Sequence, residues 1–181
     1  MLYREYGKTG VTVSALGFGG MRFRDQKNVD ACAALVKACH DKGITYFDTA
    51  IGYGDSEDVM GVALERMQKN RAAKPFYVST KTMAEDADSV RRECERSLKR
   101  LRLPYIDFYH YWCILSLEEH KARRHVLREF EKLRNEGLIK HIVLSTHVNG
   151  ADMEIIMNDH CTRRFFYVTP EHPHRRRAEA I

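Results

Sequence analysis

The chain has 181 residues, of which 44% are hydrophobic and 30% are charged, a composition typical of one soluble domain with a sizeable core. Residues 1–6 carry charges where a secretory signal needs an apolar stretch, and no later run is long enough to span a membrane. We therefore expect a cytoplasmic protein with no membrane partner.

The formal net charge of +5 is small and unevenly distributed. Residues 160–181 contain five arginines against two glutamates. A nucleic-acid-binding surface needs a longer basic stripe or a recognised motif, and neither is present. We expect no nucleic-acid partner and interpret the basic segment as a solvated tail.

The five cysteines are odd in number and show no CxxC spacing. They are Cys32, Cys39, Cys94, Cys113 and Cys161. Most lie on the apolar side of predicted helices or strands, so we interpret them as reduced packing residues. We predict neither a disulfide nor a metal site.

The N-terminal segment predicts a β-hairpin from residues 2–6 and 12–15, followed by a strand over residues 16–20. From residue 28 onward, helix-period and strand-like segments alternate. Further strands are predicted at residues 44–47, 76–80, 106–112 and 139–145. Helices are predicted to begin near residues 29 and 56, a third carries the apolar residues Val90, Cys94, Leu98 and Leu101, a long one ends near residue 136, and a short one covers residues 150–158. Asn28 is a candidate helix cap, as is Asp55 or Ser56, and Gly43 ends the first helix.

The alternation repeats about every thirty residues, which indicates βα units and a parallel sheet. The fold class predicted is α/β, a partial (β/α)8 TIM barrel with an N-terminal β-hairpin and about five βα units. A complete barrel needs at least about 200 residues. We place the barrel portion at residues 1–158 and a poorly ordered basic tail at residues 159–181, where the pattern breaks.

Three polar residues follow or end two consecutive predicted strands: Asp48, Tyr53 and Lys81. The carboxyl ends of barrel strands are where barrel enzymes place their chemistry. A phenol has a reference pKa near 10, and a neighbouring ammonium favours its ionised form. A sheltered ammonium in turn needs a counter-charge, which Asp48 can supply. The trio is suited to protonating an alkoxide as a hydride reaches a carbonyl carbon.

Taken singly, these residues have plainer interpretations. Tyr53 can be a half-buried aromatic, Asp48 a loop cap and Lys81 a surface charge. Their joint placement on successive strand ends favours a site.

The sequence resembles the aldo-keto reductase family. The resemblance is carried by residues 43–50 with Tyr53 and Ser56-Glu57, by residues 79–81, and further by residues 16–21 and 107–109. It implies a (β/α)8 barrel that binds NADPH or NADH and reduces small-molecule aldehydes or ketones. Tyr53 would be the proton donor, with Lys81 and Asp48 tuning it.

The resemblance also extends to positions on the cofactor side of the barrel. By similarity, the residues near the cofactor would be Gly20, Met21, Asp48 and Ser145.

One departure concerns the family's catalytic histidine, which lies five positions after the aspartate of the fourth strand. Here that position, counted from Asp107, is Trp112. His110 lies two residues earlier, facing the same side of a regular strand but about 6–7 Å deeper. A bulge could re-aim His110, whereas Trp112 offers an N–H donor only. Both are candidate catalytic residues.

A second departure is the absence of the family's later strands, which carry the nicotinamide-stacking aromatic and the phosphate-binding residues. An opened barrel would expose a strand edge, through which the chain could self-associate. The alternative function is therefore a non-catalytic binding or assembly module, or an inactive remnant of such an enzyme.

Overall fold

The computed structural model describes residues 1–162. The elements in chain order are β1 (Tyr3–Glu5), β2 (Thr12–Ser14), β3 (Phe18–Gly19), the 3₁₀ turn η1 (Gly20–Arg22), α1 (Val29–Asp41), β4 (Tyr46–Asp48), α2 (Ser56–Gln68), β5 (Tyr77–Thr82), α3 (Ala87–Leu101), β6 (Ile106–Ile114), α4 (Leu117–Arg123), the 3₁₀ turn η2 (Arg124–Val126), α5 (Leu127–Asn135), β7 (Ile139–Thr146) and α6 (Gly150–Asn158).

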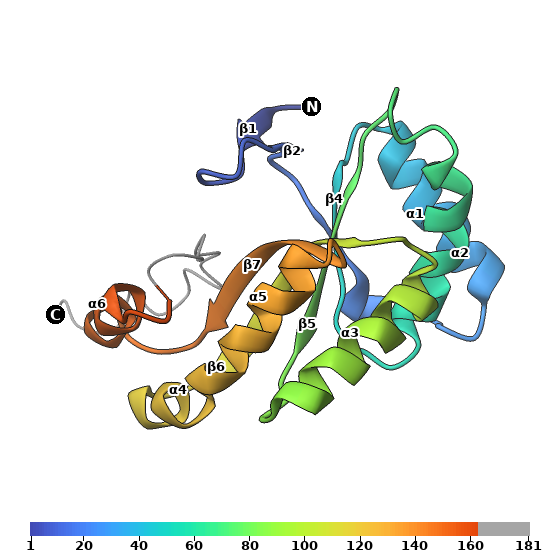
Figure 1. The fold of residues 1–181 in the computed structure, drawn as a ribbon. Coiled ribbons are helices and arrows are strands. Elements are labelled where there is room, and N and C mark those ends of the chain that lie inside the picture. The colour runs from blue at the N-terminus through green and yellow to red at the C-terminus, as the bar shows by residue number, and fades with distance from the viewer. Residues whose placement is uncertain (163–181) are drawn as a thin grey trace, which may run out of the picture.

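Strands β3 to β7 form one parallel sheet in the order β3-β4-β5-β6-β7. Strands β1 and β2 pair as a separate antiparallel hairpin. Sequential order in a parallel sheet requires a crossover after each strand, and helices supply these crossovers. Helices α1, α2, α3 and α5 form an outer layer in which each contacts the next (Figure 1). This confirms the predicted fold class, five consecutive βα units of a (β/α)8 barrel.

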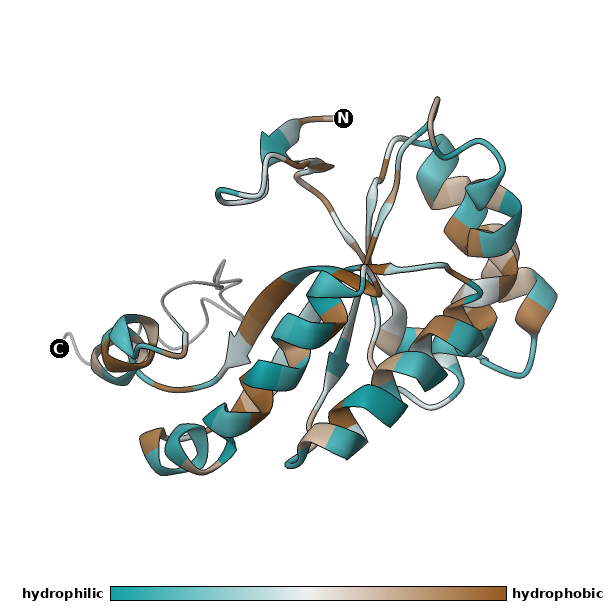
Figure 2. Ribbon diagram, viewed as in Figure 1, coloured by the Kyte–Doolittle hydropathy of each residue, from teal (hydrophilic) through white to brown (hydrophobic). Residues whose placement is uncertain are grey.

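The main core lies between the outer face of the sheet and the inner faces of these helices. Val36, Leu64, Leu101 and Phe130 come from four different helices and pack with Phe47 of β4, all fully buried or nearly so. Burial of each such side chain contributes about 1.5–3 kcal/mol. Hydrophobic and hydrophilic stretches alternate along α3 and α5 in Figure 2, as expected for helices with one face on the sheet.

The N-terminal hairpin covers the amino-terminal end of the strands through Tyr6. The Tyr6 ring lies 5.5 Å from Tyr46 and 4.4 Å from Phe108, centroid to centroid. Phe108 also stacks on His141 at 5.2 Å. This aromatic cluster draws on the hairpin and on three strands, and it closes the interior beneath the strand carboxyl ends.

Asp107 fixes the register between β5 and β6. Its buried carboxylate accepts hydrogen bonds from Arg71 at 2.7 and 2.6 Å and from the Val78 backbone N–H at 2.8 Å. Burial nevertheless raises the pKa of Asp107. In the register so defined, Lys81 lies opposite His110.

Most predicted helix boundaries agree with the structure. Asn28 caps α1 by accepting from the Ala31 N–H, and Gly43 follows the helix with a φ of +96°. Asp55 precedes α2, but its side chain makes no capping hydrogen bond. The long helix predicted to end near residue 136 is interrupted by the 3₁₀ turn η2, after which α5 begins at Leu127, and both Val126 and Leu127 are buried.

The predicted tail lies mostly outside the described residues, since only residues 159–162 of it fall within them. Among residues 1–162, no helix combines the length and apolar character needed to cross a membrane. All five cysteines carry thiols rather than disulfides.

The close approach of α2 to α3 depends on Gly61. A Cβ at Gly61 would lie 2.1 Å from the Arg100 carbonyl oxygen. We expect Gly61→Ala to lower the free energy of unfolding by about 1–3 kcal/mol in urea denaturation, because overpacking outweighs the better helix propensity of alanine. Gly150→Ala is the matched control, since nothing lies within 4 Å of its Cβ position. Equal stability of the two variants would contradict the prediction.

Candidate active site

The site is organised around the ammonium group of Lys81, whose side chain is 1% exposed. Lys81 Nζ donates to Asp48 Oδ2 at 2.6 Å, to the Thr49 carbonyl oxygen at 2.8 Å and to the Tyr53 hydroxyl oxygen at 3.3 Å. It also lies 4.7 Å from the centroid of the Tyr53 ring. The three residues predicted from strand ends are therefore in direct contact.

The parallel pairing of β4 and β5 explains this convergence. Asp48 pairs with Ser79 in register, and Lys81 follows two residues later on the same face. The Ser79 hydroxyl donates to Asp48 Oδ1 at 2.5 Å, while the Thr49 N–H donates to the Ser79 carbonyl at 2.9 Å. The carboxylate is thus held by β5 at both oxygens and faces the ammonium in a fixed orientation.

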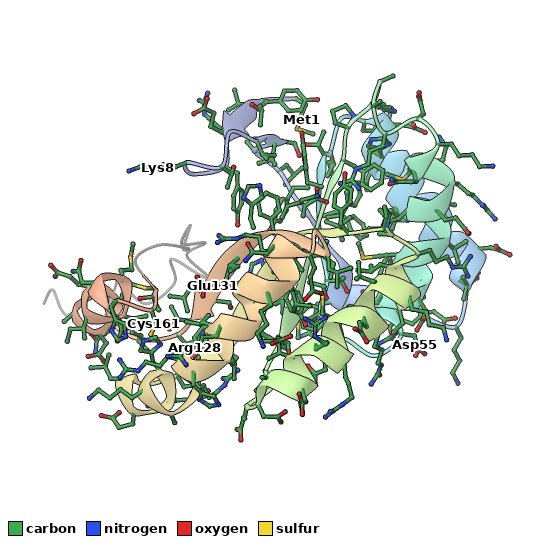
Figure 3. The ribbon with its side chains drawn as sticks, viewed as in Figure 1. Met1, Lys8, Asp55, Arg128, Glu131 and Cys161 are labelled. Carbon is green, nitrogen blue, oxygen red and sulfur yellow. The ribbon has the colours of Figure 1, made fainter. Side chains whose placement is uncertain are left out.

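The loop that carries Tyr53 is held by two residues that the sequence did not single out. Gln26 donates to the Tyr53 carbonyl at 3.0 Å and accepts from the Asp55 N–H at 2.8 Å. Arg100 donates to the Gly54 carbonyl at 2.6 Å, from the carboxyl-terminal turn of α3. Asp55, in the loop after Tyr53, is labelled in Figure 3. Tyr53 itself and the two residues that follow it are therefore fixed from outside the loop.

Arg100 is itself anchored through the buried carboxylate of Glu57. Arg100 Nη1 lies 3.2 Å from Glu57 Oε2, and Thr80 donates its hydroxyl to Glu57 Oε1 at 2.6 Å. Thr80 is the residue before Lys81 and points to the opposite face of β5. Glu57, the second residue of the Ser-Glu pair recognised in the sequence, thus links the Tyr53 loop, through Arg100, to the strand of Lys81.

Trp112 lies beside Tyr53, at the position five residues after Asp107. The two rings are 5.7 Å apart, centroid to centroid, with an interplanar angle of 89°. Lys81 Nζ is 5.9 Å from the Trp112 ring centroid. This edge-to-face contact places an indole where the family resemblance leads one to expect an imidazole.

His110 lies deeper, in register with Lys81, and is 2% exposed. Neither ring nitrogen has a hydrogen-bond partner within residues 1–162. Burial, followed by the charge of Lys81, lowers the pKa of His110 well below its usual range. The structure therefore brings Trp112, and not His110, against the Tyr53 ring.

The residues expected near a cofactor occupy different environments. A Cβ at Gly20 would lie 2.5 Å from Ser56 Oγ and 3.0 Å from the Asp48 carbonyl, so this position requires glycine for packing. Met21 is 47% exposed. Ser145 is fully buried on β7, and its hydroxyl has no hydrogen-bond partner among the described residues.

A second group of polar side chains lies after α6, away from Lys81. Ligand-type atoms of Asp159, His160 and Cys161 lie within 4.8 Å of one another, although no metal site was predicted. The Asp159 carboxylate already pairs with Arg124. Next to this group is a cavity of about 430 Å³, whose lining includes Cys161 and Arg128, both labelled in Figure 3.

The Aldo/keto reductase family model matches residues 15–173 of the chain. The chain belongs to this family. The match extends past residue 158, where composition had placed the end of the barrel portion.

Known aldo-keto reductase relatives are similar to this chain over part of their length. L-galactose dehydrogenase from Arabidopsis thaliana is 32% identical over 151 residues, covering 77% of this chain and 46% of the relative. Methylglyoxal reductase DkgA from Escherichia coli O157:H7 is 32% identical over 124 residues, covering 68% and 42%. The chain thus spans less than half the length of these curated relatives.

A solved structure supports the same assignment. A family member from Pseudomonas aeruginosa superposes with a TM-score of 0.67 at 29% identity, covering 80% of this chain and 60% of that one. AKR11C1 from Bacillus halodurans shares the fold, with a TM-score of 0.71 at 24% identity.

The burial of His110 predicts a pH dependence of stability. Because its pKa is lowered in the folded chain, the unfolded chain binds a proton more readily, so this stability is present above about pH 6.5 and is lost below it. We expect the free energy of unfolding in urea to fall between pH 7.5 and pH 5.5 in the wild type and in His110→Leu. The fall should be about 1 kcal/mol larger in the wild type. Burial lowers the pKa of His40 and His120 too, so the slope should shrink without vanishing. An unchanged slope in His110→Leu would contradict the prediction.

Proposed function

We propose that this chain carries the acid–base half of an NAD(P)H-dependent carbonyl reductase, which reduces an aldehyde or ketone with Tyr53 as proton donor. The observation that supports this most directly is the contact of one buried ammonium, Lys81, with both the Asp48 carboxylate and the Tyr53 hydroxyl. Family membership supports the same class of reaction.

In the proposed reaction, Tyr53, Lys81 and Asp48 have different roles. The Tyr53 hydroxyl donates its proton to the carbonyl oxygen of the substrate, and the proton is later restored from solvent. Lys81 Nζ stabilises the phenolate that remains, because an ammonium at hydrogen-bond distance favours the ionised form. Asp48 keeps the buried ammonium charged and oriented. Bound NADPH or NADH supplies the hydride that reaches the carbonyl carbon.

The described residues also fit a nicotinamide cofactor. Ser145 presents a buried hydroxyl whose hydrogen-bonding capacity no described residue uses, and a buried polar group of this kind calls for a partner. We propose that Ser145 binds the cofactor, together with the Gly20–Met21 segment and the edge of the site formed by Asp48. Trp112 would replace the family's histidine beside the substrate carbonyl, as a donor only.

Removing the proton donor should abolish turnover without unfolding the chain. We expect Tyr53→Phe and Lys81→Met to lower kcat by about 10²–10⁴-fold, the usual range for acid–base catalysis, in assays of reduced-nicotinamide consumption with a panel of aldehydes. Tyr3→Phe is the control, since Tyr3 lies on the exposed hairpin and its hydroxyl donates to the Gly43 carbonyl. Full activity in Tyr53→Phe would refute Tyr53 as the proton donor.

Cofactor binding can be tested separately by NADPH titration, following quenching of Trp112, the only tryptophan of the chain. Loss of one neutral hydrogen bond costs about 0.5–1.5 kcal/mol, so we expect Ser145→Ala to weaken binding by about 2–10-fold. Ser97→Ala is the matched control, because Ser97 on α3 also carries a buried hydroxyl without a partner among the described residues.

The titration also separates the proposed function from its alternative. If the folded wild-type chain does not bind NADPH at any protein concentration, the non-catalytic binding or assembly module is favoured. Binding that strengthens as protein concentration rises would show that self-association contributes to the site.

A further inference from the structure

Near its carboxyl end β6 departs from regular pairing with β7. Tyr111 pairs with Leu144 and Ile114 with Thr146, so Trp112 and Cys113 together face the single residue between those partners. This is a β-bulge, which bends a strand and re-aims its side chains. Cys113 adopts a φ of +62°, a left-handed conformation that is uncommon for residues other than glycine. The distortion therefore needs support from its surroundings.

Arg123 of α4 supplies that support. Its Nη1 and Nη2 atoms both donate to the Trp112 carbonyl oxygen at 3.2 Å, and the side chain is only 5% exposed. Glu119, one helical turn earlier, accepts from Arg123 Nη1 at 2.5 Å and from the Leu115 N–H at 2.9 Å. The Arg123–Glu119 pair thus binds the backbone on both sides of Cys113, the residue with the left-handed conformation. These bonds are charge-assisted, and those of the buried Arg123 side chain are shielded from water more than the bond of Glu119 to Leu115.

The side chain that the bulge re-aims is the Trp112 indole, which meets the Tyr53 ring edge to face. The indole also packs close to Gly52, the residue before Tyr53, where a Cβ would lie 3.3 Å from two of its ring atoms. The indole therefore borders the phenol and leaves little room beside it. In a reductase of the proposed kind, the substrate carbonyl must reach the Tyr53 hydroxyl past this ring.

We propose that Trp112 is the wall that limits the width of substrates reaching Tyr53, and that Arg123 with Glu119 positions this wall through the bulge. Arg123 is a positioning residue, since it acts through the Trp112 backbone and does not touch the reacting atoms. The role in substrate choice rests on the proposed function, whereas the hold on Trp112 does not.

The single tryptophan makes the positioning directly measurable. We expect Arg123→Met to shift Trp112 emission to longer wavelength and to increase its quenching by acrylamide, because the released indole gains contact with water. Arg123→Lys, which keeps the charge but not the forked donor, should show an intermediate change. Arg91→Met is the control, since Arg91 is also an ion-paired arginine, but its ion pairs with Glu129 and Glu136 join it to residues outside β6.

Substrate selectivity provides the second readout. In Arg123→Met we expect the ratio of kcat/KM for benzaldehyde to that for propanal to rise about 10-fold, the scale set by a small change in pocket size. A variant that was merely less stable would lose activity toward both aldehydes alike. A wild-type ratio in a variant with shifted emission would overturn the assignment of Trp112 as the wall.

The outcomes remain distinct if a variant or the proposed function fails. If Arg123→Met does not fold, Glu119→Gln and Arg123→Lys take its place, and wild-type emission in both would overturn the positioning role. An equal emission shift in Arg91→Met would overturn it as well. A further outcome is that the wild type reduces no aldehyde while Trp112 emission shifts in the Arg123 and Glu119 variants but not in Arg91→Met. In that case the proposed function fails and the positioning role stands.

Discussion

The buried ammonium of Lys81 is the constraint on which the site depends. A cation removed from water is costly unless it is paired and fully hydrogen-bonded. Lys81 meets this requirement with one carboxylate, one backbone carbonyl and one phenol. Each partner comes from the carboxyl end of β4 or the loop after it, so that loop cannot move far without exposing an unpaired charge. The same contacts that stabilise the cation therefore fix the geometry of Tyr53.

Several parts of the fold hold this loop and its neighbour from outside. Gln26, before α1, bonds the Tyr53 carbonyl and the Asp55 N–H, and Arg100 reaches the Gly54 carbonyl from the end of α3. Arg123 acts comparably on the end of β6, through the Trp112 carbonyl. Each is a long side chain that bonds to backbone atoms, so each constrains the path of the chain more than the chemistry of a side chain. Precise sites need such supporting contacts, because the reacting groups alone cannot hold their own orientation.

Much of this was accessible from the sequence. The order of the strands, the cap at Asn28 and the convergence of Asp48 with Lys81 follow from local periodicity and from the rule that parallel strands end at one edge. The support contacts were not accessible, because Gln26 and Tyr53 are 27 positions apart and no local pattern pairs them. The interruption of the helix before residue 127 likewise arises from tertiary packing. The sequence allows for a bulge that re-aims His110, but the observed bulge lies after Tyr111 and leaves His110 in register with Lys81. A bulge leaves no periodic signal when both flanking segments remain strand-like.

The hydrogen bonds of Asp107 that align β5 with β6 bear on which residues the carboxyl ends of these strands can carry. Since its carboxylate bonds to the Val78 N–H, β5 and β6 are aligned near their amino-terminal ends, remote from the chemistry. From Asp107, the third residue pairs with Lys81 in regular register, and the fifth, which belongs to the bulge, borders Tyr53. The residue five positions after Asp107 can change in evolution without disturbing this alignment of the strands. An indole could thus replace an imidazole here while the frame that presents it stayed the same.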